Sequence, residues 1–126
     1  MNVTGVDFIA IPTQDFDRAE AFYADVLGLE RSKRWGNMPA GEFENGTVTI
    51  ALMQSDAFGL EFSSHSHPVA FQVDDVHAAR EELEGKGVEF LTENHGWGDY
   101  RWTHFRGPDG NVYGITTGPY TDGGGA

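Results

Sequence analysis

The chain has 126 residues, no cysteine and a formal net charge of −12 from 8 Lys+Arg and 20 Asp+Glu. Its length suits a single domain, 1–126, and the missing cysteines exclude disulfides, zinc–thiolate sites and cysteine nucleophiles. The acidic balance argues against nucleic-acid partners and favours cationic ones, although solubility alone also explains an acidic surface. With no apolar run of about 18 residues and no leader-like segment, we expect a cytoplasmic protein that does not enter a membrane.

The first half of the chain predicts one strand, one helix and three further strands. Asp15 can cap the helix, which carries one apolar stripe and is followed by glycine, a residue common just after a helix end. An Asn45-Gly46 pair is typical of a two-residue type I′ turn between the last two strands. The predicted strands are 5–12, 30–35, 41–44 and 47–53.

A polar linker, 55–67, precedes a second set of elements. The stretch 107–111, Gly-Pro-Asp-Gly-Asn, combines a fixed φ with residues that accept positive φ, and so predicts a tight hairpin. A Gly-rich segment, 121–126, predicts a flexible tail. The expected elements of this half are strands at 68–75, 88–93, 100–106 and 111–117, and a helix at 76–86.

The two halves form an internal repeat. Residues 9–15 align with residues 69–75 at an offset of 60, and each half is predicted to be β-α-β-β-β. The pattern indicates an α+β fold of two tandem modules, about 5–54 and 68–117, with helices on one face of each sheet. The other face of each sheet is then left for a partner sheet or a ligand.

Three motifs carry a resemblance to a known family. They are FYADVLGL (22–29), VAFQVDD (69–75) and PDGN (108–111), set within the doubled module. This combination resembles the vicinal-oxygen-chelate superfamily of glyoxalase I, fosfomycin and bleomycin resistance proteins, and extradiol dioxygenases. The resemblance implies a curved, cup-shaped mixed sheet with helices on its convex side, and a homodimer. It says little about activity, because one fold hosts many functions.

Enzymes of this family typically hold a divalent metal with His or Glu at four strand positions. The resemblance places those positions at Phe8, Ala51, Pro68 and Gly114. None of these side chains has a lone pair to offer a metal, so we expect no metal and no other cofactor. His67, beside Pro68, would turn inward only after a register slip that reverses the whole strand.

The resemblance and the alternation of side chains also suggest what lines the cup. Aromatic and small residues leave a broad apolar surface, on which a planar or cationic ligand can stack. His104 and Glu42 are the candidate catalytic or orienting groups. The candidate ligand-binding residues are Tyr100, Trp102, Gln72, Thr49, Met53 and Glu44, with Trp97 and Trp35 at the rim.

Each of these residues also has an ordinary structural interpretation. Tyr100 and Trp102 can fill the cup as a second core, and His104 can be a hydrogen-bonded structural histidine. Glu42 and Glu44 can be solvated charges beside a turn. His65 and His67 are expected in solvent.

Two functions from different classes remain open. The first is a metal-independent small-molecule-binding protein of the bleomycin-resistance type, which holds an aromatic or cationic ligand. The alternative is a small cofactor-free enzyme, an isomerase or lyase, that moves a proton with His104 and a carboxylate such as Glu42.

Overall fold

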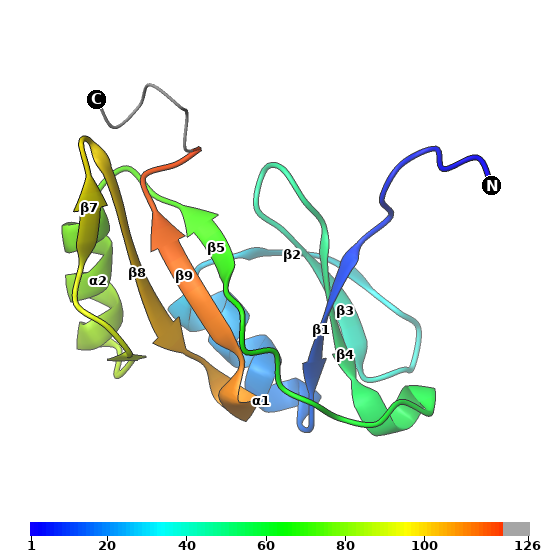
Figure 1. The fold of residues 1–126 in the computed structure, drawn as a ribbon. Helices are drawn as coiled ribbons and strands as arrows, with labels where there is room; N and C mark the ends of the chain where they lie inside the picture. Colours follow the sequence, from blue (N-terminus) through cyan, green and yellow to red (C-terminus); the bar gives the residue numbers. More distant parts are fainter. Residues whose placement is uncertain (120–126) are drawn as a thin grey trace. The chain divides into compact units, whose positions relative to one another are not determined.

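A computed structural model describes residues 1–119 of the chain. The chain divides into two compact units, Met1–Ser64 and His65–Ala126, and the boundary falls inside the predicted linker (Figure 1). Each unit contains a mixed sheet with a helix, which confirms the α+β class. No helix within residues 1–119 has the length and apolar character needed to cross a membrane. The predicted tail, 121–126, lies outside the described residues.

The first unit has a four-stranded sheet in the order β1-β4-β3-β2. Strands β1 and β4 are parallel, and the other pairs are antiparallel. Its strands are β1 (Ile9–Thr13), β2 (Glu30–Arg34), β3 (Ala40–Glu44) and β4 (Ile50–Gln54). Its helical segments are α1 (Phe16–Ala21), the π-helical segment Phe22–Val26 and the 3₁₀ helix Ser55–Phe58.

One face of the first sheet packs against α1 and the π-helical segment. Asp15 caps α1 as predicted, and its carboxylate accepts a hydrogen bond from the N–H of Arg18 at 3.2 Å. The Tyr23 ring lies edge-on to Phe43, with centroids 5.3 Å apart. Full burial stabilises side chains of this kind by about 1.5–3 kcal/mol each. The buried set is Ile11, Phe16, Ala19, Tyr23, Phe43, Ile50 and Leu52.

The second unit repeats this plan with one added strand. Its sheet has the order β5-β9-β8-β6, with β7 also paired to β8, and β5 and β9 are parallel. The strands are β5 (Val69–Gln72), β6 (Glu89–Phe90), β7 (His95–Trp97), β8 (Tyr100–Arg106) and β9 (Val112–Thr116). The helical segments are α2 (Val76–Gly85) and the 3₁₀ turn Pro108–Gly110.

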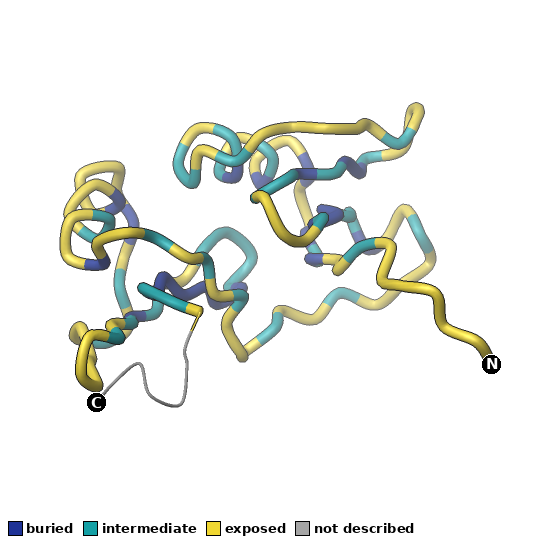
Figure 2. Tube along the Cα trace, turned by 90° about the horizontal axis from the view of Figure 1, so that it is seen from above, coloured by how far each residue is buried: buried dark blue, intermediate teal, exposed yellow. Residues whose placement is uncertain are grey.

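The core of the second unit lies between α2 and one face of its sheet. Phe105 and Tyr113 stack at 5.6 Å between centroids, and Ile115 is buried beside them on β9. Val76 and Leu83 close this core from α2. Figure 2 shows buried positions along the strands and helices of both units, whereas the segment before β1 is exposed.

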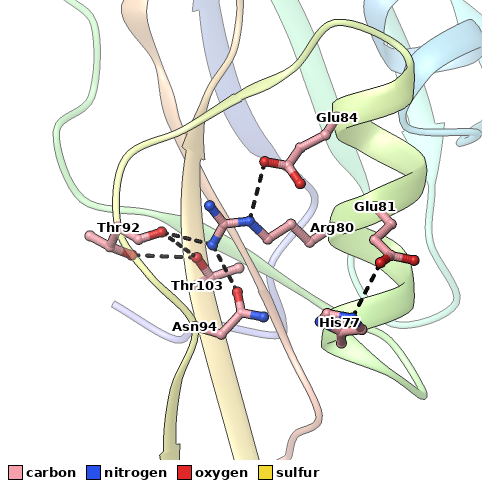
Figure 3. A network of polar contacts seen from close by, with 7 residues as sticks. All are labelled: His77, Arg80, Glu81, Glu84, Thr92, Asn94 and Thr103. Carbon is pink, nitrogen blue, oxygen red and sulfur yellow. Dashed lines mark hydrogen bonds and ion pairs between the residues drawn. The ribbon is translucent and has the colours of Figure 1, made fainter.

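Arg80 joins α2 to the segment between β6 and β7 (Figure 3). Its Nη1 donates to the carbonyl of Thr92 and to Oδ1 of Asn94, both at 2.9 Å. Its Nε lies 3.5 Å from the carboxylate of Glu84, and the guanidinium stands over the ring of Phe90 at 4.6 Å. This half-buried side chain therefore links α2 to the edge of the sheet, in addition to the apolar packing of Val76 and Leu83.

Strand registers confirm the predicted repeat. In the first unit Ile9 pairs with Ile50, and in the second Val69 pairs with Tyr113. The offset is 60 residues for the first strand of each pair (9 to 69) and 63 for the second (50 to 113). Each unit is thus built around the same parallel pair.

The predicted type I′ turn at Asn45-Gly46 is wrong. The loop runs from 45 to 49, and Glu42 pairs with Ala51, whereas a two-residue turn at Asn45-Gly46 would have paired it with Thr49. The Asn45 side chain holds this wider loop: its Oδ1 accepts from the N–H groups of residues 47 and 48, and its Nδ2 donates to the carbonyl of residue 48. The shift is two residues, so every side chain keeps its predicted face.

Other predicted boundaries also differ. The expected strand 88–93 is reduced to Glu89–Phe90, and β7 was not predicted. The first strand begins at Ile9, so residues 5–8 precede it. The apolar stripe of the first helix is only partly buried, because the wider π-helical turn of Phe22–Val26 changes the angle between successive side chains.

The hairpin at 107–111 forms as predicted and also anchors the linker. The N–H of Gly107 donates to the carbonyl of Asn111 at 2.9 Å, and Asp109 has a φ of 65°. The buried Asn111 accepts, through Oδ1, the backbone N–H of His65 at 3.1 Å. His65 was expected in solvent, but its ring packs edge-on against Tyr113 at 5.6 Å. Its Nδ1 donates to the carbonyl of His67.

Candidate functional site

Three candidate residues of β8 lie on the sheet face that points away from α2. Because side chains alternate along a strand, Tyr100, Trp102 and His104 share one face, while Thr103 and Phe105 are buried on the other. Trp102 pairs with Thr116 of β9, and His104 pairs with Gly114. All three candidates are half-buried, so part of each remains accessible.

His104 lies against Gly114. A Cβ atom placed on Gly114 would be 3.1 Å from Cδ2 of His104 and 3.6 Å from the Cβ of Ala70. The His104 imidazole therefore borders the space that a side chain at 114 would enter. The imidazole has no hydrogen-bond or ion-pair partner within residues 1–119, and a ligand could use both of its nitrogens.

The β7–β8 hairpin extends this face into an aromatic row, which consists of His95, Trp97, Tyr100 and Trp102. His95 pairs with Trp102 and Trp97 pairs with Tyr100, and paired residues share a face. The ring centroid of Trp102 lies 5.5 Å from that of His95 and 5.7 Å from that of Tyr100. Trp97 is 61% exposed, which agrees with its predicted place at a rim.

Sequence reasoning missed His95. The available signal was Gly98-Asp99, a two-residue turn between two aromatic residues, in which Gly98 has a φ of 57°. Such a turn predicts a hairpin whose register places His95 opposite Trp102. Gln72 was predicted correctly on this face: it pairs with Thr116, and its side chain is exposed.

In the first unit, the face away from α1 carries Glu42 with Trp35. The Trp35 indole Nε1–H donates to Oε2 of Glu42 at 2.7 Å. Its ring lies edge-on to Phe8 at 5.1 Å and to Phe58 at 6.0 Å. Glu42 is therefore a half-buried, hydrogen-bonded carboxylate instead of a solvated charge beside a turn.

Glu44 and Thr49 are hydrogen-bonded to each other on the same face. The Thr49 hydroxyl donates to the Glu44 carboxylate at 3.0 Å, and Ser32 donates to it at 3.3 Å. Met53 pairs with the buried Ala40 and is half-buried. Glu42 belongs to the first unit and His104 to the second, so their use as a pair remains a prediction.

The four positions implied for a family metal do not fit one. Ala51 is fully buried at 0% exposure, Phe8 packs on Trp35, and Gly114 lies against His104. Within the described part of either unit, no three His, Asp or Glu side chains come close enough to hold a metal ion. The register of β5 also keeps Pro68 on the side of Ala70, so the slip that would turn His67 inward does not occur.

The sequence matches one protein family over most of its length. Residues 5–115 match the Glyoxalase/Bleomycin resistance protein/Dioxygenase superfamily. The uncharacterized protein YraH of Bacillus subtilis (strain 168) is 30% identical over 116 residues, which cover 82% of this chain and 91% of that protein.

Solved structures share the fold. A glyoxalase/bleomycin resistance protein/dioxygenase from Nocardioides has a TM-score of 0.75 at 24% identity, covering 99% of this chain and 89% of that chain. Lactoylglutathione lyase from Agrobacterium tumefaciens has a TM-score of 0.70 at 22% identity, covering 92% of this chain and 95% of that chain. The match over residues 5–115, together with this fold, shows that the chain belongs to the Glyoxalase/Bleomycin resistance protein/Dioxygenase superfamily.

Proposed function

We propose that this protein is a metal-independent binding protein for an aromatic or cationic small molecule. The observation that carries the proposal is the open face of the second unit, where the aromatic row continues to His104 beside Gly114. A planar ligand stacked on Trp102 and Tyr100 would place a polar group within reach of the unpartnered imidazole of His104.

Charge supports the cationic part of this proposal. The net charge of −12 raises the local concentration of cations around the protein. A cation over the face of a Trp or Tyr ring gains about 0.5–1 kcal/mol at exposed sites and about 2 kcal/mol when desolvated. Two or three such contacts would supply about 1–6 kcal/mol of the roughly 8 kcal/mol that corresponds to a micromolar Kd, and the buried aromatic area would have to supply the remainder.

Calorimetric titration with 10-methylacridinium, a planar aromatic cation, tests the proposal. We expect saturable binding that weakens about tenfold in Trp102→Leu, because about 1.4 kcal/mol of stacking and cation–π attraction is lost. Neutral acridine at pH 8 should bind more weakly, and tetramethylammonium more weakly still. Phe71→Leu is the matched control, since it removes a ring that stacks on Tyr113 on the other face of the same sheet. Equal losses in both variants would contradict the proposal.

A proton-transfer enzyme is the second candidate, because the unpartnered imidazole of His104 also suits a general base. Deuterium exchange from D₂O into a C–H bond of a bound compound separates the two functions. An enzyme should catalyse this exchange and lose it in His104→Gln. A protein that binds the compound without any exchange is a binding protein.

We also propose that the working form is a homodimer, as the family resemblance implies. Strands β1 and β5 are edge strands of their own sheets, and edge strands offer unpaired backbone groups. Light scattering at micromolar concentration should give twice the chain mass of 13.8 kDa. A monomer at that concentration would contradict the proposed dimer and would leave the proposal about the ligand unaffected.

A further inference from the structure

A depression lies between the β7–β8 hairpin and the start of α2. We call it the α2 groove; it has a volume of about 610 Å³ and is lined by Asp74, His77, Asn94, Gly96, Arg101 and Thr117 among others. Arg101 alternates with Tyr100 and Trp102 along β8, so it points away from the aromatic row. His95 lines the groove and also belongs to the aromatic row, whereas Arg101 and Asp74 line the groove alone. A ligand held by Arg101 and Asp74 therefore does not depend on the proposed function.

One wall of the α2 groove carries a fixed guanidinium. Arg101 lies across Gly96, where an added Cβ would stand 2.6 Å from Nη1 of Arg101. Its Nη1 donates to the carbonyls of Gly98 and Tyr100. Its backbone N–H donates to Oγ1 of Thr117 at 2.8 Å. Because Nη1 makes both guanidinium bonds within residues 1–119, Nε and Nη2 are left to bind a ligand.

The lining also supplies a carboxylate that has no partner. Asp75 caps α2 and accepts the N–H of Ala78 at 3.0 Å. Asp74 makes no hydrogen bond or ion pair within the described part of the chain, and neither does Arg101 form an ion pair there. Asp74 and Arg101 are opposite charges that line one groove without pairing within the 4.0 Å that defines an ion pair.

We propose that the α2 groove binds a zwitterionic amino acid. Arg101 would receive the ligand carboxylate, for which the planar guanidinium is well matched, and Asp74 would receive the ammonium group. A simple anion would meet Asp74 and Asp75, and a simple cation would meet Arg101, so a ligand with both charges suits the groove best. The volume lies within the range of about 300–1,000 Å³ typical of small-molecule sites.

Amide NMR titration of the full chain with L-leucine tests the proposal. This probe is aliphatic, so it avoids competition from the aromatic row. We expect saturable shifts at Asp74, Gly96, Gly98 and Arg101. L-leucinamide, which lacks the carboxylate, and N-acetyl-L-leucine, which lacks the ammonium, should bind at least tenfold more weakly. Equal binding of either derivative, or no saturable shift at these residues, would overturn the proposal.

A pair of variants tests the same contact without altering the hairpin. Asp74→Asn keeps the side-chain size and should weaken L-leucine binding at least tenfold, whereas binding of the anion N-acetyl-L-leucine should strengthen because a repelling charge is removed. Glu82→Gln removes the same charge from α2 outside the groove and should leave both affinities unchanged. Equal weakening by both variants would mean that general electrostatics governs binding and would refute the assigned site. Binding of 10-methylacridinium should persist in Asp74→Asn, which keeps this test independent of the proposed function.

Discussion

His104 and Gly114 are paired across β8 and β9, and each restricts what the other can be. The family resemblance implies a metal-binding carboxylate at position 114, yet a Cβ there would meet Cδ2 of His104 at 3.1 Å and the carbonyl of Thr103 at 3.3 Å. Either neighbour would have to shift by a few tenths of an ångström to admit that atom. The His104 imidazole therefore limits the size of the side chain that position 114 can hold.

Gly114→Ala should destabilise the protein by about 1–3 kcal/mol, because overpacking forces a neighbour to shift. In the His104→Ala background the same substitution should cost less, since the ring that it meets is gone. Urea unfolding of the four proteins in this double-mutant cycle measures the coupling. Additive effects would show that the contact with His104 does not limit position 114.

At the scale of elements, Arg80 and His77 of α2 both make polar contacts in Figure 3, but the two contacts differ in how much they stabilise the protein. Arg80 is half-buried and bonds to Thr92 and Asn94 across the unit, whereas His77 forms an exposed i,i+4 contact with Glu81 at 3.3 Å. Exposed pairs of the second kind contribute little to stability. Hydrogen bonds from a half-buried charged donor contribute more, and the acceptor carbonyl of Thr92 is itself partly buried.

Arg80→Met should lower the free energy of unfolding by about 1.5–3 kcal/mol, because the acceptors at 92 and 94 lose their charged donor while the apolar stem is retained. His77→Gln, the matched control on the same helix, should change it by less than about 0.5 kcal/mol. Thermal and urea unfolding measure both. An equal effect of the two substitutions would mean that Arg80 does not fasten α2 to the sheet edge.

The β7–β8 hairpin serves both sides of its sheet. One face presents the aromatic row, and the other places Arg101 across Gly96. The turn at Gly98-Asp99 sets this register, so a residue that disfavours the positive φ of Gly98 would disturb both faces at once.

At the scale of the whole molecule, the proposed absence of a bound metal rests on all four implied ligand positions, because none of them carries a metal-binding side chain. Protein purified from cells and dialysed without chelator should contain no stoichiometric zinc, iron, nickel or manganese, because Phe8, Ala51, Pro68 and Gly114 supply no donor atoms. Elemental analysis is the measurement. One tightly held metal per chain would contradict the proposed metal independence.

The sequence by itself was enough to predict the repeated β-α-β-β-β plan, the cap at Asp15 and the hairpin at 107–111. These features depend on local signals: alternation, capping side chains and residues that accept positive φ. The repeat makes the prediction of the fold more secure, because the same pattern occurs twice. The parallel pairs β1–β4 and β5–β9 confirm the repeat.

Only the tertiary structure decided how the candidate residues meet. The short strand β7, the contact of His104 with Gly114 and the bond from Trp35 to Glu42 all join residues from different segments. Local propensity carries little information about such contacts, because strand pairing and side-chain packing fix them. The alternation in the sequence therefore predicted that Tyr100, Trp102 and His104 share one face of their sheet, and the tertiary structure determined which neighbours each of them contacts.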